Sequence, residues 1–176
     1  MEAPDSFSLS LTPAEMEAQC AALTQQFRSP AQVLSALVAL QSLFASAPPG
    51  QRENAPYREI QAVISRHAEI VRAQLLAECR ARLLAALQRR DTLEVTRVHG
   101  ALSRNGFWQA GAEAASARGN TDLQGDLAWL KEWCASARAR AEAASPYPDA
   151  LDFRAAGIAV EEYTAMDELL RCVRSL

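Results

Sequence analysis

The side chains most often used for acid–base, nucleophilic or metal chemistry are few in this chain of 176 residues. There are two histidines, His67 and His99, and neither lies near a cysteine in the sequence. The four cysteines are widely spaced and form no CxxC pair: Cys20, Cys79, Cys134 and Cys172. These spacings do not fit a zinc site. We therefore expect the cysteines to pack as small apolar side chains, in an intracellular reducing compartment: the cytoplasm, or an organelle matrix if the chain is a processed form.

The motifs of the common enzyme classes are absent from the sequence. It contains no GxSxG, P-loop, GxGxxG or HExxH pattern. Asp122 and Asp126 lie one turn apart at an expected helix start, where carboxylates stabilise the helix dipole. His67 falls on an apolar stripe, and His99 lies beside Gly100 at an expected helix contact. We therefore predict a protein that is not an enzyme, with no cofactor, no metal and no small-molecule substrate.

Charge is distributed unevenly along the chain. The net charge is −3, but residues 52–104 carry ten arginines and six acidic residues, whereas both flanking segments are acidic. Two interpretations remain open: pairing with neighbouring acidic residues, or contact with a partner that has an acidic surface. Trp108 is either a core residue or an exposed interface anchor. The predicted partner-binding residues are Arg80, Arg82, Arg89, Arg90, Arg97, Arg104 and Trp108.

The composition predicts an all-α fold. Alanine occurs 36 times and arginine 17 times, and aromatic residues make up only 6% of the chain. Strong helix formers therefore dominate, while the β-branched and aromatic residues that favour strands are sparse. No apolar run is long enough to cross a membrane, so we expect no membrane insertion.

Local signals predict about eight helices. N-terminal capping boxes are expected at Thr12, Ser29 and Asp91, each with Glu or Gln three residues later. Apolar residues at spacings of three and four predict one long central helix over 56–90, with no Gly or Pro inside it. The expected helices are Pro13–Arg28, Pro30–Ser46, 56–90, 92–103, 107–118, 122–144, 150–156 and 159–174.

Short connections between these helices predict antiparallel neighbours. The architecture is then either an irregular helical bundle or a short stack of antiparallel hairpins. We expect an extended N-terminal arm over residues 1–11, a helical core over 12–144, and a C-terminal helical appendage over 145–176 that packs on the core.

Residues 95–106, VTRVHGALSRNG, resemble the first helix and turn of a pentatricopeptide- or tetratricopeptide-type hairpin. Residues 107–115 are similar to its second helix, and the resemblance extends over 55–119. It implies a surface that holds proteins or, in pentatricopeptide families, single-stranded RNA. We predict a non-catalytic adaptor or accessory subunit. The alternatives are a secretion-type chaperone and a helical-repeat RNA binder, although the overall acidity makes nucleic acid an unfavoured partner.

Overall fold

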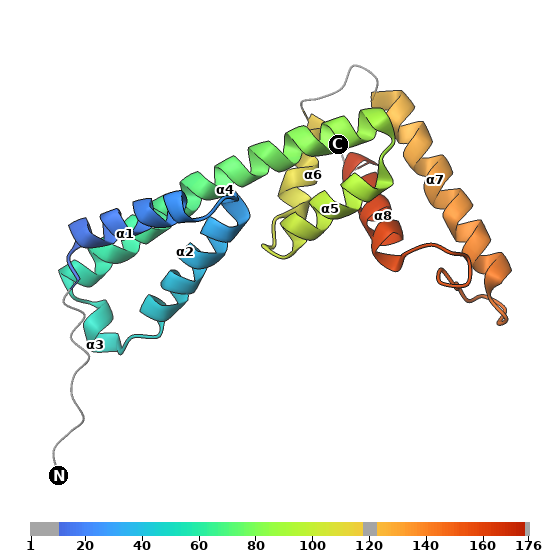
Figure 1. Ribbon diagram of the computed structural model, residues 1–176. Helices are drawn as coiled ribbons and strands as arrows, with labels where there is room; N and C mark the ends of the chain where they lie inside the picture. Colours follow the sequence, from blue (N-terminus) through green and yellow to red (C-terminus); the bar gives the residue numbers. More distant parts are fainter. Residues whose placement is uncertain (1–10, 118–122, 175–176) are drawn as a thin grey trace, which may run out of the picture. The chain divides into compact units, whose positions relative to one another are not determined.

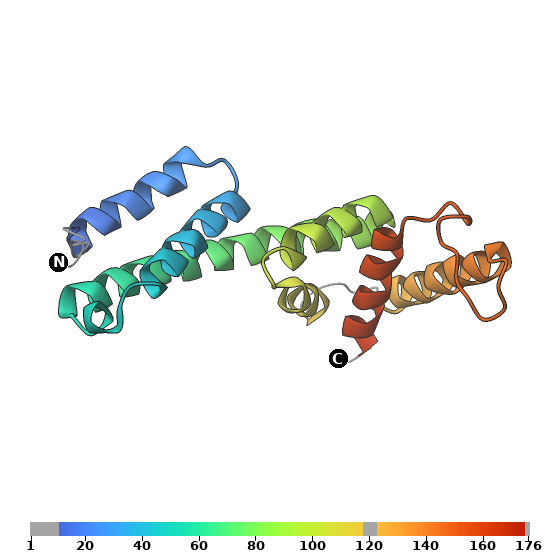
Figure 2. The ribbon, with the colours of Figure 1, turned by 90° about the horizontal axis from the view of Figure 1, so that it is seen from below.

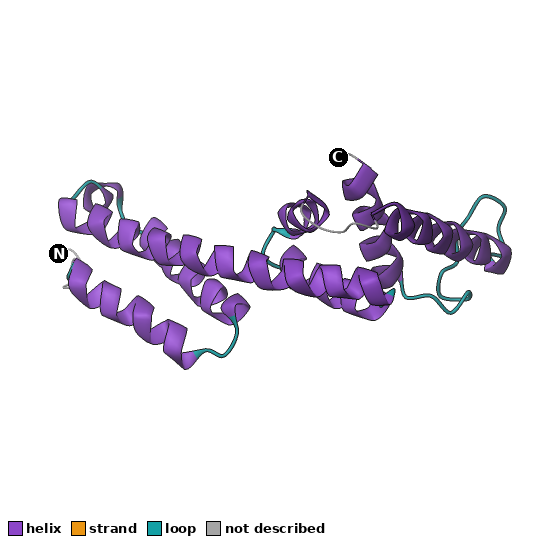
Figure 3. Cartoon of the chain, turned by 90° about the horizontal axis from the view of Figure 1, so that it is seen from above, coloured by secondary structure: helices purple, strands orange, loops and turns teal. Residues whose placement is uncertain are grey.

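The computed structural model describes residues 11–117 and 123–174, and within them the fold is all-α (Figures 1 and 3). No helix of the described residues has the length and apolarity that crossing a bilayer requires. The predicted N-terminal arm and Asp122 fall outside the described residues, Leu11 excepted. The helices are α1 (Pro13–Gln26), α2 (Pro30–Ala45), α3 (Pro49–Arg52), α4 (Ala55–Arg89), α5 (Thr92–Ser103), α6 (Trp108–Ala117), α7 (Leu123–Ala144) and α8 (Val160–Arg174).

Capping residues set the start of the first two helices. At α1 the box is complete: the Glu15 amide donates to Thr12 Oγ1 at 3.2 Å, and the Thr12 amide donates to the Glu15 carboxylate at 2.7 Å. At α2 the Gln32 amide donates to Ser29 Oγ at 3.3 Å, and no side-chain bond returns from Gln32. Both helices begin with Pro, whose missing N–H costs nothing at this position.

Two predicted segments have a different local structure. The loop expected after α2 contains the one-turn helix α3. The helix expected over 150–156 is instead a series of turns. There the Ala155 amide donates to Asp152 Oδ1 at 2.8 Å, and Gly157 has a φ of +69°. A side chain that binds nearby backbone N–H groups stabilises a turn in place of a continuing helix.

The long helix α4 confirms the prediction of one central helix. Its buried positions recur every three or four residues: Ile60, Ile64, Ala68, Val71, Leu75, Cys79, Leu83 and Leu87. The compact units of the chain divide between Leu75 and Leu76, inside this helix, so α4 contributes residues to both. The sequence-based division at residue 145 stays a prediction about which parts fold independently.

The N-terminal unit consists of α1, α2, α3 and the first part of α4 (Figure 2). Glu17 of α1 pairs with Arg66 and, at 2.8 Å, with His67 Nε2 of α4. The ring centroids of Phe44 in α2 and Tyr57 in α4 lie 5.6 Å apart. These polar and aromatic contacts therefore connect α1 and α2 to α4.

The C-terminal unit is built around α8, which packs against α5, α6 and α7. The inner face of α8 is almost inaccessible to solvent, and its buried residues are Ala165, Met166, Leu169, Leu170 and Val173. Helix α8 thus contributes one whole face to the core of this unit.

The α5–α6 hairpin has the Asn105-Gly106 turn that the sequence predicts. Gly106 adopts a φ of +68°, and the Phe107 amide donates to the Leu102 carbonyl at 2.9 Å. Gly111 of α6 lies so close to α5 that an added Cβ would overlap Leu102 Cδ1, a fully buried side chain. The small residue at this position therefore sets how closely the two helices approach.

This packing predicts opposite effects for two glycine substitutions. Gly111→Ala should lower the free energy of unfolding by about 1–3 kcal/mol, because the added Cβ would overlap Cδ1 of the fully buried Leu102 and would force that side chain to shift. Gly100→Ala, with only ordinary contact at 3.5 Å to Arg104, should raise it by about 0.5–1 kcal/mol through helix propensity. Denaturant melts of both variants check this, and a shift in the same direction for both would contradict the packing.

Candidate functional site

The predicted arginines lie on the last turns of α4 and along α5, and the structure divides them by environment. Arg82 pairs with an acidic residue, and Arg80 is half-buried, with its Nε buried and without a hydrogen-bond partner among the described residues. Arg89, Arg90 and Arg104 are exposed and form no ion pair with a described residue. Both interpretations of the basic segment therefore apply, each to different residues.

Glu94 is the acidic residue that pairs inside this region. Its amide donates to Asp91 Oδ1 at 3.0 Å, so Asp91 caps α5 as predicted. Its carboxylate does not complete the predicted capping box. Instead, it accepts a 2.8 Å hydrogen bond from Arg82 Nε of α4 and lies 3.6 Å from Arg97 Nη1. The hydrogen bond from Arg82, more than burial or Arg97, determines the pKa of Glu94 and holds it below its ordinary value.

The side of α5 opposite its buried residues forms an exposed stripe. Leu93 is 64% exposed, and the Arg97 side chain is 72% exposed one turn further along. Arg104 follows seven residues later, on the same side of the helix, and its guanidinium lies over Gly100.

We call Leu93, Arg97 and Arg104, together with Arg89 at the end of α4 and Arg90 in the turn that follows it, the α5 stripe. The sequence analysis did not select Leu93, because its exposure beside Arg97 and Arg104 becomes evident only when the buried side of α5 is known.

The turn that presents Arg90 has an unusual backbone. Arg90 adopts a φ of +54°, while its amide donates to Leu87 O and the Asp91 amide donates to Ala86 O at 2.9 Å. This is the helix-ending geometry in which glycine is preferred, because a Cβ is unfavourable at positive φ. An arginine at this position costs stability and places an exposed guanidinium at the corner between two helices.

Trp108 is a core residue. Its burial argues against the predicted role in binding a partner. It is 7% exposed, and its ring meets the His99 ring edge-on at a centroid distance of 4.6 Å. His99 Nε2 lies 2.7 Å from Glu168 Oε2 and 3.3 Å from Ser103 Oγ. Because Ser103 and Glu168 share one ring nitrogen, they cannot act as the nucleophile and orienting acid of a catalytic triad. The cluster connects α5, α6 and α8.

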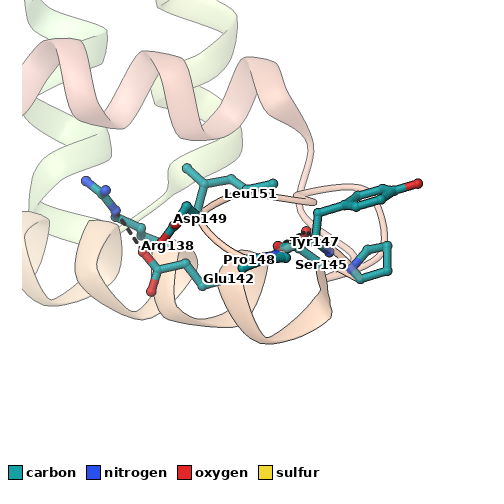
Figure 4. A pocket seen from close by; sticks show the side chains of 9 residues that line it. Arg138, Glu142, Ser145, Tyr147, Pro148, Asp149 and Leu151 are labelled. Carbon is teal, nitrogen blue, oxygen red and sulfur yellow. Dashed lines mark hydrogen bonds and ion pairs between the residues drawn. The ribbon is translucent and has the colours of Figure 1, made fainter.

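The 145–151 loop surrounds a depression of about 520 Å³ after α7 (Figure 4). Its charged lining residues are Arg138, Glu142 and Asp149, and the first two pair with each other at 3.2 Å. Ser145 Oγ donates to the Tyr147 carbonyl at 3.1 Å and accepts from the Tyr147 amide at 3.2 Å. Tyr147 points away from these groups and is 73% exposed. The hydrogen bonds of the Ser145 hydroxyl therefore stay within the turn itself.

Three of the four cysteines are buried: Cys20, Cys79 and Cys134. Burial raises the pKa of the Cys20 and Cys79 thiols, which disfavours the reactive thiolate. Across residues 11–117 and 123–174, no three His, Cys, Asp or Glu side chains come together in a geometry that would hold a metal ion.

The chain matches no protein-family model, no curated protein and no solved structure. The resemblance of residues 55–119 to helical-hairpin repeats therefore stays a prediction, and the fold and the exposed groups themselves provide the basis for a functional proposal.

The Glu94–Arg82 hydrogen bond predicts a pH-dependent stability. Because folding lowers the pKa of Glu94 below 4.5, its contribution is complete above that pH and is lost as the pH falls through the lowered pKa. Partial exposure of both side chains limits this contribution to about 1 kcal/mol. Glu94→Gln should thus lower the free energy of unfolding by this amount at pH 7 and by almost nothing near pH 3.

The matched control is Glu78→Gln, which neutralises an exposed carboxylate on α4. Its free energy of unfolding should stay within about 0.5 kcal/mol of the wild type at both pH values. A Glu94→Gln deficit of equal size at pH 3 and pH 7 would show that the ionised carboxylate is not the stabilising group.

Proposed function

We propose that this protein is a non-catalytic adaptor or accessory subunit that binds an acidic segment of another protein through the α5 stripe. The observation that carries the proposal is the exposure of Arg89, Arg90 and Arg104 without a compensating acidic residue in the described structure. The Glu94 carboxylate already accepts a hydrogen bond from Arg82, and Asp91 Oδ1 accepts one from the Glu94 amide. Free guanidinium groups are able to bind carboxylates in a bidentate manner.

The stripe also defines the chemistry of the partner. Leu93 provides an exposed aliphatic group between the basic turn and Arg97. The residues at 93, 97 and 104 share one side of a rigid helix and match a partner helix with acidic residues around one apolar residue. Arginine is enriched among the residues that dominate binding energy at protein interfaces, and a nearby apolar side chain excludes water from the ion pairs.

A charge-reversal pair tests this assignment. Arg89→Glu with Arg90→Glu should weaken binding to the co-purifying partner by about tenfold or more, since two attractive contacts become repulsive. The thermal midpoint should change little, because neither side chain pairs within the described residues. The measurement is co-purification of the tagged protein from its source cells, with the bound proteins identified by mass, combined with a thermal melt.

The control pair is Arg28→Glu with Arg58→Glu, which makes the same charge change at exposed sites of the N-terminal unit. It should keep the partner. Equal loss of binding and stability in the Arg89/Arg90 variant would mean that these arginines are structural. Retention of RNA instead of protein, removed by nuclease, would favour the helical-repeat RNA binder.

Arg90→Gly separates binding from stability at a single position. Glycine relieves the positive-φ strain and should raise the free energy of unfolding by about 0.5–1 kcal/mol. The same change removes one guanidinium and should weaken partner binding. Opposite shifts in a melt and in a binding titration are therefore expected. A variant that gains stability and binds as tightly as the wild type would remove Arg90 from the proposed surface.

A further inference from the structure

The helix α2 differs from every other helix that the structure describes because it has no charged side chain. No Asp, Glu, Lys or Arg occurs between Arg28 and Arg52. Even so, Leu43 is 68% exposed on one face of the helix, and Val38 is 42% exposed on another. The face that carries Leu43 is uncharged and open to solvent.

A groove runs beside this face, between α1 and α2. It has a volume of about 330 Å³ and contains no residue of α4. Its lining side chains are aliphatic or carry an amide: Gln19, Ala22, Leu23, Gln26, Ala36 and Leu40. Leu43 follows Leu40 by three residues and so extends the same side of α2.

The chemistry of the groove favours a second copy of the same chain as its occupant. A two-fold symmetric contact brings together the same surface of both copies. A surface that carries charges of one sign would therefore repel its equivalent in the second copy. Here no lining residue is charged, and Glu15, one turn before Gln19 on the same side of α1, is not part of the lining. The amides of Gln19 and Gln26 each contain a donor and an acceptor, so they are able to hydrogen-bond to identical amides across the axis.

We propose that two copies of the protein associate through the outer faces of α1 and α2. The four helices would form a bundle in which Leu43 of each copy contributes to a shared apolar contact and the glutamines pair at its edges. This self-association uses no residue of the α5 stripe, so it stands independently of the proposed function.

The size of this face predicts weak association. The helices contain 14 and 16 residues, and one face of two such helices lies at the small end of specific protein interfaces. We therefore expect a monomer–dimer equilibrium with a dissociation constant of about 1–100 µM. Sedimentation equilibrium of the full chain over this concentration range measures it directly.

The test is an isosteric charge pair. Gln19→Glu with Gln26→Glu changes two exposed amides into carboxylates of the same shape, so four negative charges would meet across the axis. The dissociation constant should rise at least tenfold. The control, Gln74→Glu with Gln88→Glu, adds the same charge at exposed positions of α4 and should leave the constant within twofold.

An apolar pair guards against effects on folding. Leu43→Ala should weaken the dimer, whereas Ile70→Ala, at a residue 51% exposed on α4, should not. Circular dichroism melts confirm that each variant is folded. A wild type that stays monomeric up to about 500 µM would overturn the proposal. So would a dimer that survives the Gln19/Gln26 change, or one that both charge pairs disrupt equally, because the contact would then lie elsewhere.

Discussion

The burial of Val95, Val98 and Leu102 determines which side of α5 faces solvent, and the hydrogen bond between Glu94 and Arg82 supports that orientation. It connects two helices across a turn of only two residues, Arg90 and Asp91, and so fixes the direction in which α5 leaves α4. Val95, Val98 and Leu102 then face the interior, where α8 packs. Leu93, Arg97 and Arg104 are left on the opposite side. The exposure of the α5 stripe thus follows from the apolar residues that face α8 and from the paired carboxylate of Glu94.

Much of the fold could be predicted because its signals are local. Thr12 and Ser29 mark helix starts within three residues of sequence, and the spacing of apolar residues defines α4 along its whole length. The 150–156 segment was predicted wrongly as a helix because composition favours one there. The Asp152 amide instead donates to the Ala141 carbonyl at 2.9 Å, a contact across the chain that residue propensities do not reveal.

The candidate surface could be predicted only as a region. The sequence identifies the basic segment. It does not show that Arg82 is paired while Arg89 is not, because the partner of Arg82 is Glu94, twelve residues further along the chain. Trp108 was offered as an interface anchor because its type is common in interfaces, yet its burial against His99 depends on α6 meeting α5. Leu93 was missed because a single exposed leucine is ordinary until its neighbours along the helix are known.

The two surfaces that we propose differ in chemistry, so each would bind a different kind of partner surface. The α5 stripe gains binding energy from guanidinium groups, so its contacts weaken as salt screens them. The α2 face has no charge, and association through it should be almost insensitive to salt. A dimer would present two α5 stripes, and a partner with two acidic segments would then bind with increased avidity wherever its spacing allows both contacts. The uneven distribution of charge, basic in the middle of the chain and absent from α2, is therefore the common basis of both proposals.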